Sequence, residues 1–374
     1  MTKPHPLAPA ALPAPLPSRA PLQTPTRPLR VGLIGYGNAG STFHAPLIST
    51  TPDLELAAIV TSDPERQARA RADHPTAVVV NKPRQLWTEA DGLDLIVIAT
   101  PNRTHAPLAR AALTAGLATV IDKPIAVTAD EAAELIALAE AHDVLLSVFQ
   151  NRRWDSNFLT ARHLVESGRL GTVWRYEARF ERWRPALKGG WRELGDPGEA
   201  GGLLYDLGSH LVDQALQLFG PADRVYAELD VRRPGAQADD DAFVTLHHAS
   251  GVRSQLSMTV LTAGPDPVIR VLGDQGSYAK HGLDGQEDAL KAGLTPLSPD
   301  WGVEDATLRG VLDDGSGPVV VESVPGAYQV FYARMAAAIR GAGPVPVDPR
   351  DALAALRVLE AARLSAQEHR VVTL

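Results

Sequence analysis

Two residues of complementary chemistry, Asp206 and His210, stand four positions apart in the segment Gly201–Asp213. On a predicted helix this spacing places both side chains on one face. A carboxylate beside an imidazole fixes the tautomer and orientation that a general base needs, and the reference pKa of histidine, about 6.5, suits proton transfer. The segment therefore predicts an acid–base site in which Asp206 orients His210. The alternative is an aspartate that caps the helix and a histidine that faces solvent.

Lys123 is the next candidate, in Asp122-Lys123-Pro124 directly after the apolar run Ala118–Ile121. A lysine at the carboxyl end of a parallel strand points into the crevice where ligands bind. There it can hold a substrate hydroxyl and a ribose hydroxyl, and it can stabilise an alkoxide as hydride leaves. The same residues also fit a surface lysine beside a turn proline. We predict that Lys123, Asp206 and His210 are the catalytic residues and also bind substrate. We predict no metal site, because Asp206-x-x-x-His210 supplies few ligands.

A nucleotide-binding turn is predicted where the apolar stretch from Leu29 runs into a G-x-G-x-x-G pattern. The first glycine permits a tight turn, the second lets the backbone approach a pyrophosphate, and the third lets a helix pack close to the strand. The helix that follows offers free N–H groups and roughly half a positive charge to a phosphate. The sequence therefore predicts dinucleotide binding by Gly35, Tyr36, Gly37, Asn38, Ala39 and Gly40.

The tip of the second predicted strand, Leu54–Thr61, bears on the choice between NAD and NADP. An acid there accepts hydrogen bonds from the adenosine ribose and repels a 2′-phosphate, so Asp63 would select NAD. If Ser62 occupies that position instead, Arg66 is near enough to hold the phosphate of NADP. A third interpretation makes Asp63 only a turn starter and helix N-cap. We favour NADP and leave NAD open.

The segment after the buried run Leu93–Ala99 is a third candidate for contact with the cofactor. Asn102 can hydrogen-bond the nicotinamide ribose or amide, or it can form with Pro101 the turn that opens the next helix. His105, on the first turn of that helix, is expected to be structural more than catalytic. The predicted cofactor residues here are Thr100, Pro101, Asn102 and His105, together with Asp122 and Lys123.

Polar residues also gather where the chain crosses from its first part to its second. The predicted substrate ligands there are Asn151, Arg153 and Asp155. Trp191 and Arg192 are predicted to lie beside the cofactor and help line the same pocket. A solvated run of charge is the alternative for Arg152, Arg182, Arg184 and Lys188.

The elements that must position these residues follow two patterns. Strand and helix alternate over 29–150, which is typical of a parallel sheet with crossover helices. After Asn151 the pattern becomes antiparallel: Val173–Phe180 alternates strictly, with Trp174, Tyr176, Ala178 and Phe180 on the face expected to be buried. The predicted fold class is α/β, with a Rossmann doubly wound parallel sheet at 29–150. An α+β domain with a large, mostly antiparallel open sheet follows at 151–374, and its last helix packs back on the body.

Composition limits the function further. The 374 residues carry a formal net charge of −8, which argues against nucleic acid as a partner, and no cysteine, which fits a reducing cytoplasm. Residues 1–28 are rich in proline and alanine and are expected to form a disordered tail rather than a secretory signal. No later segment approaches 18 uninterrupted apolar residues, so no membrane span is predicted.

The fragments G-Y-G-N-A-G, T-P-N-x-x-H, D-K-P and D-L-G-S-H-x-x-D, in this order, resemble the glucose–fructose oxidoreductase/inositol dehydrogenase (Gfo/Idh/MocA) family over residues 29–374. Three further fragments are similar to the branch that contains NADP-dependent scyllo-inositol dehydrogenases: Phe43–Pro46, Asn151–Asp155 and Pro234–Gln237. The resemblance implies a nicotinamide-dependent dehydrogenase acting on a secondary hydroxyl of a cyclitol or sugar. The rivals are a regulator that binds NAD(P) without catalysis and a glycosidase that keeps NAD bound.

The resemblance also assigns residues. It places the family's catalytic lysine on Lys123, its aspartate on Asp206 and its histidine base on His210, and it implies a cis peptide between Lys123 and Pro124. It further implies a homodimer or homotetramer formed through the outer face of the second sheet. One departure is Asp122, where the family commonly has glutamate. Another is Asp63, where NADP-selective relatives often carry a basic residue, and this keeps the cofactor preference open.

Overall fold

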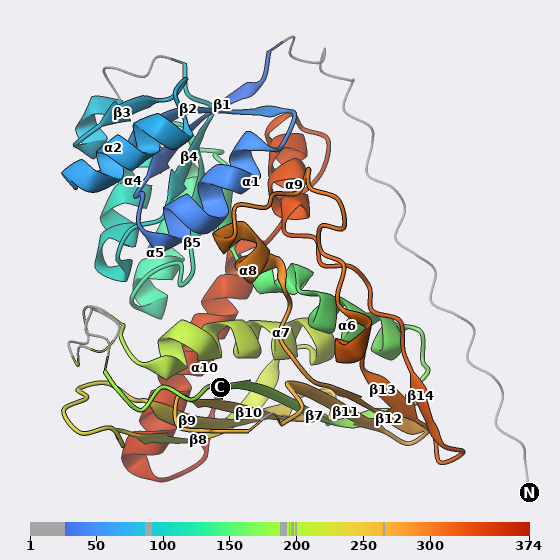
Figure 1. Ribbon diagram of the computed structural model, residues 1–374. Helices are drawn as coiled ribbons and strands as arrows, with labels where there is room; N and C mark the ends of the chain where they lie inside the picture. The colour runs from blue at the N-terminus through green and yellow to red at the C-terminus, as the bar shows by residue number, and fades with distance from the viewer. Residues whose placement is uncertain are drawn as a thin grey trace, which may run out of the picture.

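The computed structural model describes residues 27–86, 92–187, 193, 195, 198, 200–264 and 266–374 (Figure 1). The tail predicted for 1–28 therefore lies outside the described residues except for Arg27 and Pro28. Trp191 and Arg192, predicted to line the pocket, also lie outside them, as does Lys188. Arg27 is anchored by two hydrogen bonds that it donates to the carboxylate of Asp94, at 2.7 and 3.0 Å.

Six parallel strands form the first sheet in the order β3-β2-β1-β4-β5-β6. Their bounds are β1 Leu29–Ile34, β2 Leu54–Val60, β3 Val78–Val80, β4 Leu95–Ile98, β5 Ala118–Asp122 and β6 Leu146–Phe149. The connecting helices are α1 Ala45–Ser49, α2 Pro64–Asp73, α4 His105–Thr114 and α5 Ala129–Ala141. The run in β4 is fully buried, as expected of a parallel strand covered on both faces. Strand order reverses between β1 and β4, and ligands bind at such switch points. The predicted Rossmann sheet is confirmed.

Nine strands form the second sheet in the order β14-β13-β12-β11-β7-β10-β9-β8-β15. All neighbours are antiparallel except β7 and β10, which run parallel. The bounds are β7 Val173–Glu181, β8 Ala222–Asp230, β9 Asp241–His248, β10 Arg253–Thr259, β11 Ile269–Gly273, β12 Gly276–Lys280, β13 Val311–Asp313, β14 Pro318–Val320 and β15 Val372–Thr373. The helices α6 (Ser156–Glu166) and α7 (Ser209–Phe219) pack on one face of this sheet. The mostly antiparallel second sheet is therefore confirmed.

Strand β7 departs from the predicted alternation at one residue near its start. Tyr176, Ala178 and Phe180 are buried as expected, but Trp174 is 47% exposed. The guanidinium of Arg175 lies over the ring of Trp174, 5.1 Å from its centroid. On the opposite face Glu177 is buried, because Arg179 and Arg270 form ion pairs with it.

The C-terminal helices join the two sheets. After α8 (Gln286–Lys291) and α9 (Gln329–Ile339), the long helix α10 (Pro349–Glu368) contacts α5 and β6 on one side and α7 and β8 on the other (Figure 1). The carboxylate of Glu360 on α10 accepts a 2.7 Å hydrogen bond from the backbone N–H of Ala129 at the start of α5. Within the described part of the chain, no helix combines the length and hydropathy needed to cross a bilayer.

Candidate active site

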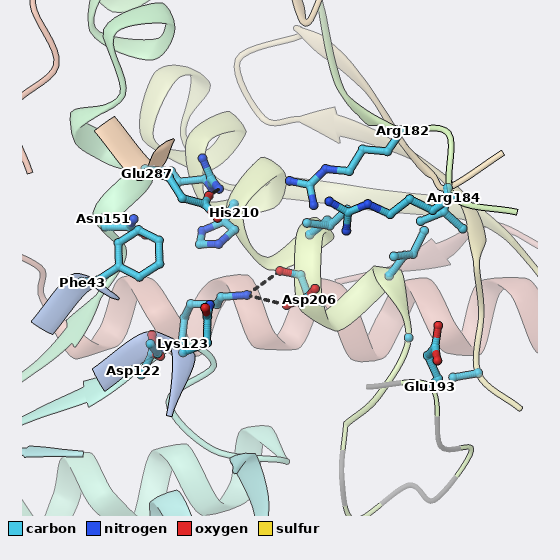
Figure 2. A pocket seen from close by; sticks show the side chains of 18 of the residues that line it. Phe43, Asp122, Lys123, Asn151, Arg182, Arg184, Glu193, Asp206, His210 and Glu287 are labelled. Atoms are coloured by element: carbon cyan, nitrogen blue, oxygen red, sulfur yellow. Dashed lines mark hydrogen bonds and ion pairs between the residues drawn. The ribbon is translucent and has the colours of Figure 1, made fainter. Parts of the chain in front are cut away.

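A cavity of about 460 Å³ lies where the carboxyl ends of the parallel strands meet the second sheet. Lys123 enters it just past the end of β5, Asp206 from the turn before α7, and His210 from the first turn of α7 (Figure 2). These three residues are distant in sequence and line one cavity. Asn38, Ala39, Asp122 and Asn151 from the predicted set line it as well.

Lys123 and Asp206 form the closest polar contact in this cavity. The ammonium Nζ of Lys123 donates to the backbone oxygen of Asp206 at 2.5 Å and to its carboxylate Oδ1 at 3.1 Å. The peptide bond between Lys123 and Pro124 is cis, as the resemblance implied. Because one ammonium is held by two oxygens of the same residue, its position at the strand end is well defined.

His210 is 5% exposed, and burial holds the pKa of its imidazole well below the usual range. The nearby cations Lys123, Arg152 and Arg182 lower that pKa further, so the ring is neutral at physiological pH. Its Nδ1 atom is buried and meets no hydrogen-bonding partner among the described residues.

Asp206 therefore does not orient His210 through Nδ1, which corrects the geometry expected from the sequence. Residues Leu204–Gly208 form a π-helical turn (η7) ahead of α7. Asp206 and His210 both line the cavity, but Nδ1 of His210 accepts and donates no hydrogen bond to the carboxylate. The carboxylate of Asp206 turns toward Lys123 instead.

Gly202, just before this turn, makes room for a capping carboxylate. A Cβ atom at Gly202, whose φ is +91°, would collide with the carboxylate of Asp239. That carboxylate accepts a 2.8 Å hydrogen bond from the backbone N–H of Leu204, and it thereby caps the helix. Gly202 thus admits an internal capping group at the start of the turn.

Asp122, the shorter acid before Lys123, is held by groups within the fold. Its Oδ1 accepts a 2.8 Å hydrogen bond from the backbone N–H of Lys123, and its Oδ2 lies 3.9 Å from Nε2 of His44. Burial alone would raise the pKa of Asp122, but His44 and Lys123 outweigh it and lower that pKa. The Nδ1 of His44 lies 2.6 Å from the hydroxyl of Tyr332. Asp122 is thus an ionised residue that helps to fix the start of the Lys123 loop.

The glycine turn after β1 has the shape that a dinucleotide requires. Gly35 has a φ of +104°, and a Cβ there would strike the carbonyl of Ala99, while a Cβ at Gly40 would strike the carbonyl of Gly35. At Gly37 an added Cβ would meet only Nη1 of Arg66, at 3.6 Å. The first and third glycines are therefore demanded by packing, whereas the middle one leaves open space for a pyrophosphate. Tyr36 points away, with its hydroxyl donating to Asp73 at 2.9 Å.

The tip of β2 shows how the three interpretations of Asp63 compare. Asp63 is the N-cap of α2, and its Oδ1 accepts hydrogen bonds from the backbone N–H groups of Glu65 and Arg66 at 2.9 and 3.1 Å. Its Oδ2 lies 3.7 Å from Nε of Arg66. Ser62 is exposed, and the guanidinium of Arg66 extends over Gly37. The capping role of Asp63 is thus present, and Arg66 lies beside the predicted cofactor turn.

In the segment after β4, Asn102 and His105 are buried, whereas Pro101 is exposed. Asn102 is buried, and its amide donates to the carbonyl of Ala200 at 3.5 Å. Both ring nitrogens of His105 lie within hydrogen-bond distance of carbonyls: Nδ1 is 2.8 Å from Pro124 and Nε2 is 2.9 Å from Thr100. Thr100, Pro101, Asn102 and His105 do not line the cavity. The ring of His105 ties the Lys123 loop to the end of β4, which fits the structural role expected for it, and its cofactor contact stays a prediction.

Two of the three predicted substrate ligands at the crossing are also internal. Arg153 is 8% exposed and donates to both carboxylate oxygens of Asp213, at 2.8 and 2.6 Å, and to Asp351 at 3.0 Å. Asp155 accepts from the hydroxyl of Tyr328 at 2.6 Å. Neither lines the cavity, and their predicted role in substrate binding stays a prediction that this geometry does not support. The reason is that the 3₁₀ turn η4 (Asn151–Trp154) presents Asn151 and Arg152 to the cavity and turns Arg153 into the fold.

The cavity wall also contains residues outside the predicted catalytic, cofactor and substrate sets, among them Arg152, Arg182 and Arg184, for which a solvated run of charge was the alternative. They come from distant segments and include Phe43, His44, Arg152, Arg182, Arg184, Glu193, Arg233, Asp239, Glu287 and Lys291. The alternation Arg182-Trp183-Arg184 is the one local signal that could have placed two of them on a common face. Among the residues that the structure describes, no group of three or more histidines and acids is close enough to hold a metal ion.

Comparison with known proteins identifies the family. Residues 29–150 match the model described as "Oxidoreductase family, NAD-binding Rossmann fold" (GFO_IDH_MocA), and residues 162–374 match "Oxidoreductase family, C-terminal alpha/beta domain" (GFO_IDH_MocA_C). The uncharacterized oxidoreductase YdgJ of Escherichia coli is 44% identical, with 92% of this chain and 99% of YdgJ aligned. The scyllo-inositol 2-dehydrogenase (NADP(+)) IolW of Bacillus subtilis is 35% identical, with 92% of this chain and 96% of IolW aligned.

A solved structure agrees with these matches. The oxidoreductase yvaA of Bacillus subtilis superimposes with a TM-score of 0.88 at 34% identity, covering 94% of this chain and 100% of that one. The overall fold of this chain is thus shared with yvaA. The chain belongs to the Gfo/Idh/MocA family of oxidoreductases.

Proposed function

We propose that this enzyme is an NAD(P)-dependent dehydrogenase that oxidises a secondary hydroxyl of a cyclitol or sugar to a ketone, reversibly. The observation that carries the proposal is the convergence of an ammonium, a carboxylate and a neutral imidazole in one cavity beside the glycine turn. These are the groups that removal of a proton from an alcohol requires. The similarity to IolW, whose name states an inositol substrate, supports the cyclitol class.

The residues around the first sheet fit a nicotinamide dinucleotide. The open space at Gly37 and the start of the helix after it would receive the pyrophosphate, while Asn38 and Ala39 connect that turn to the cavity. When bound, the cofactor supplies a nicotinamide ring that accepts or donates hydride. Arg66 over the turn and the engagement of Asp63 as a helix cap favour NADP as the preferred form.

The roles of the chain's own groups follow from their environment. His210, neutral because burial and neighbouring cations lower its pKa, takes the proton of the substrate hydroxyl. Lys123 donates to the oxygen that develops negative charge as the C–H bond breaks. Asp206 acts on Lys123, since its carboxylate and carbonyl fix the ammonium in place. Burial of the site keeps bulk water from His210.

The test is a direct assay of the purified protein. NAD and NADP are supplied in parallel with a panel of inositols and aldoses, and formation of reduced nicotinamide is followed by absorbance. The expected result is oxidation of at least one polyol, faster with NADP. Nucleotide binding without turnover of any substrate in either direction would instead indicate a regulator. Cleavage of glycosides without net change in nicotinamide absorbance would indicate a glycosidase.

A further inference from the structure

Arg182 and Arg184 continue the edge of β7 beyond its last residue. The backbone N–H of Arg182 donates to Thr259 at 2.9 Å, and that of Arg184 donates to Val260 at 2.7 Å. Because this stretch keeps the alternation of a strand, both arginines face the same side, while Trp183 between them faces away and is 60% exposed. Both guanidinium groups extend into the cavity toward Asp206 and His210 (Figure 2).

The other cations that line the cavity are matched by carboxylates. The pairs are Lys123 with Asp206 at 3.1 Å, Arg152 with Asp155 at 3.2 Å and with Glu287 at 2.9 Å, Arg233 with Asp240 at 2.9 Å and with Glu193 at 3.1 Å, and Lys291 with Glu287 at 2.6 Å. Within the described part of the chain, Arg182 and Arg184 have no such partner. The nearest acids, Asp206 and Glu287, are already engaged by the cations named above.

Arg182 carries the less favourable charge when no ligand is bound, because it is half-buried whereas Arg184 is exposed. Burial, followed by repulsion from Arg184 and Arg152, lowers the pKa of Arg182, and attraction to Glu287 and Asp206 offsets this only in part. Like charges held together by a fixed backbone cost free energy, which an anion between them would recover. The whole chain is acidic, with a net charge of −8, so this cationic wall is a local feature rather than a reflection of composition.

We propose that the substrate of this site carries an anionic group, a carboxylate or a phosphate, which Arg182 and Arg184 bind while Lys123 and His210 act on the hydroxyl. This inference rests on the proposed function and narrows its substrate class from neutral polyols to polyol acids or polyol phosphates. Guanidinium groups suit it because each presents parallel N–H donors that match the oxygens of either anion. The anionic group also orients the substrate ring. When it is held by Arg182 and Arg184, only a hydroxyl on the opposite side of the ring reaches Lys123 and His210.

The first experiment compares matched compounds with saturating cofactor. Glucose is paired with glucuronate and with glucose 6-phosphate, and myo-inositol with inositol 1-phosphate. We expect kcat/KM to be at least about tenfold higher for one anionic member than for its neutral partner, because one charge-assisted contact is worth about that much. The carboxylate and phosphate arms show which anion is used. Equal or better turnover of the neutral members in both arms would overturn the proposal and leave the dehydrogenase function standing.

The second experiment removes the cations one at a time. Arg182→Gln and Arg184→Gln should each raise KM for the preferred anionic compound about 10- to 100-fold. They should leave cofactor affinity little changed and should remove most of the advantage in kcat/KM that the anionic compound has over its neutral partner. Arg253→Gln is the matched control, because Arg253 is an exposed arginine at the start of β10, outside the cavity. Weakened cofactor binding in the Arg182 and Arg184 variants, with unchanged KM for the anion, would assign these arginines to the nucleotide and reject the proposal.

A third measurement does not depend on turnover. Calorimetric titration of glucuronate and of inorganic phosphate into the cofactor-loaded protein should show binding that Arg182→Gln weakens and Arg253→Gln does not. Thermal unfolding of each variant confirms that it is folded. If no compound is oxidised with either cofactor, the proposed function fails, and this titration still decides whether the cavity binds anions. If Arg182→Gln does not weaken the binding of glucuronate or of phosphate, the proposed anion site is rejected.

Discussion

The cavity wall that comes from the six-stranded sheet is formed by strand ends and a backbone turn with Lys123 and Asp122 beside them, whereas the wall from the second domain carries more arginines. On the first wall, space and direction are set by glycines and by the ends of β1 and β5. On the second, Arg182 and Arg233 come from two separate segments. The difference implies that cofactor binding depends on backbone shape and that substrate choice depends on charge. Substitutions on the two walls should therefore affect cofactor binding and substrate choice separately.

The largest effect on turnover is expected for His210 and Lys123, which lie where the two cavity walls meet. His210→Ala and Lys123→Ala should each reduce kcat by about 10²- to 10⁴-fold, because they remove the proton acceptor and the group that stabilises the developing alkoxide. Cofactor affinity should persist, since neither side chain belongs to the glycine turn. Stopped-flow or steady-state turnover, with nucleotide binding measured separately, gives both values. Near-wild-type turnover in either variant would remove that residue from its role.

The second prediction concerns Arg153, which is buried in the fold, whereas its neighbour Arg152 lines the cavity. Arg153→Ala should lower the free energy of unfolding by about 3–5 kcal/mol, because it leaves the buried carboxylate of Asp213 without its partner. Chemical denaturation measures this loss. The double variant Arg153→Met with Asp213→Leu should recover much of it, since both buried charges are then absent. Unchanged stability of the single variant would show that the ion pair is not needed for the fold.

The third prediction concerns cofactor preference. Arg66→Ala should weaken NADP binding about 10- to 100-fold and leave NAD binding nearly unchanged, because only NADP carries the 2′-phosphate. Arg69→Ala on the same helix is the control: it removes an equal charge that pairs with Asp73. Fluorescence titration of both cofactors against both variants makes the comparison. Equal weakening of NAD and NADP binding would show that Arg66 does not distinguish the two cofactors. The alternative prediction, that Asp63 selects NAD, would then stand.

A fourth prediction contrasts two glycines of one turn. Gly37→Ala should leave the melting temperature near that of the wild type, because an added Cβ meets only the end of Arg66. It should nevertheless weaken cofactor binding, by about 1–3 kcal/mol if the methyl group crowds the pyrophosphate. Gly35→Ala should lower the melting temperature itself, since its Cβ would strike Ala99. A Gly37→Ala protein with full affinity for both cofactors would place the pyrophosphate elsewhere.

The smallest effect is a shift in the pH profile. The pKa of His210 is lowered, so the neutral base is present above that pKa and oxidation slows as pH falls through it, below about 6.5. Burial contributes most, followed by Lys123, Arg152 and Arg182. Arg182→Gln removes one of these cations and should move the acid limb of kcat/KM upward by about one unit or less. A downward shift would show that another group controls this limb.

Features that depend on neighbours along the chain could be predicted from the sequence, whereas contacts between distant residues could not. Apolar runs such as β4 and the spacing of the three glycines depend on neighbours along the chain, so both sheets and the cofactor turn were foreseeable. The pairing of Asp206 with Lys123 was not, because it joins two residues that are 83 positions apart in the chain. Nor does sequence show that Arg153 meets Asp213 while Arg152 faces the cavity. The roles of Lys123, Asp206 and His210 and the oligomeric state remain predictions.

The helix α10 has a consequence for how the protein comes apart. Because one continuous helix contacts both sheets and its Glu360 carboxylate holds the first N–H of α5, neither half can lose its fold while the other keeps its surface covered. A chain that stopped before Pro349 would uncover apolar surface on both sides of the cleft at once. The molecule should therefore denature in one cooperative transition, and a ligand bound on either side should raise the melting temperature of the whole.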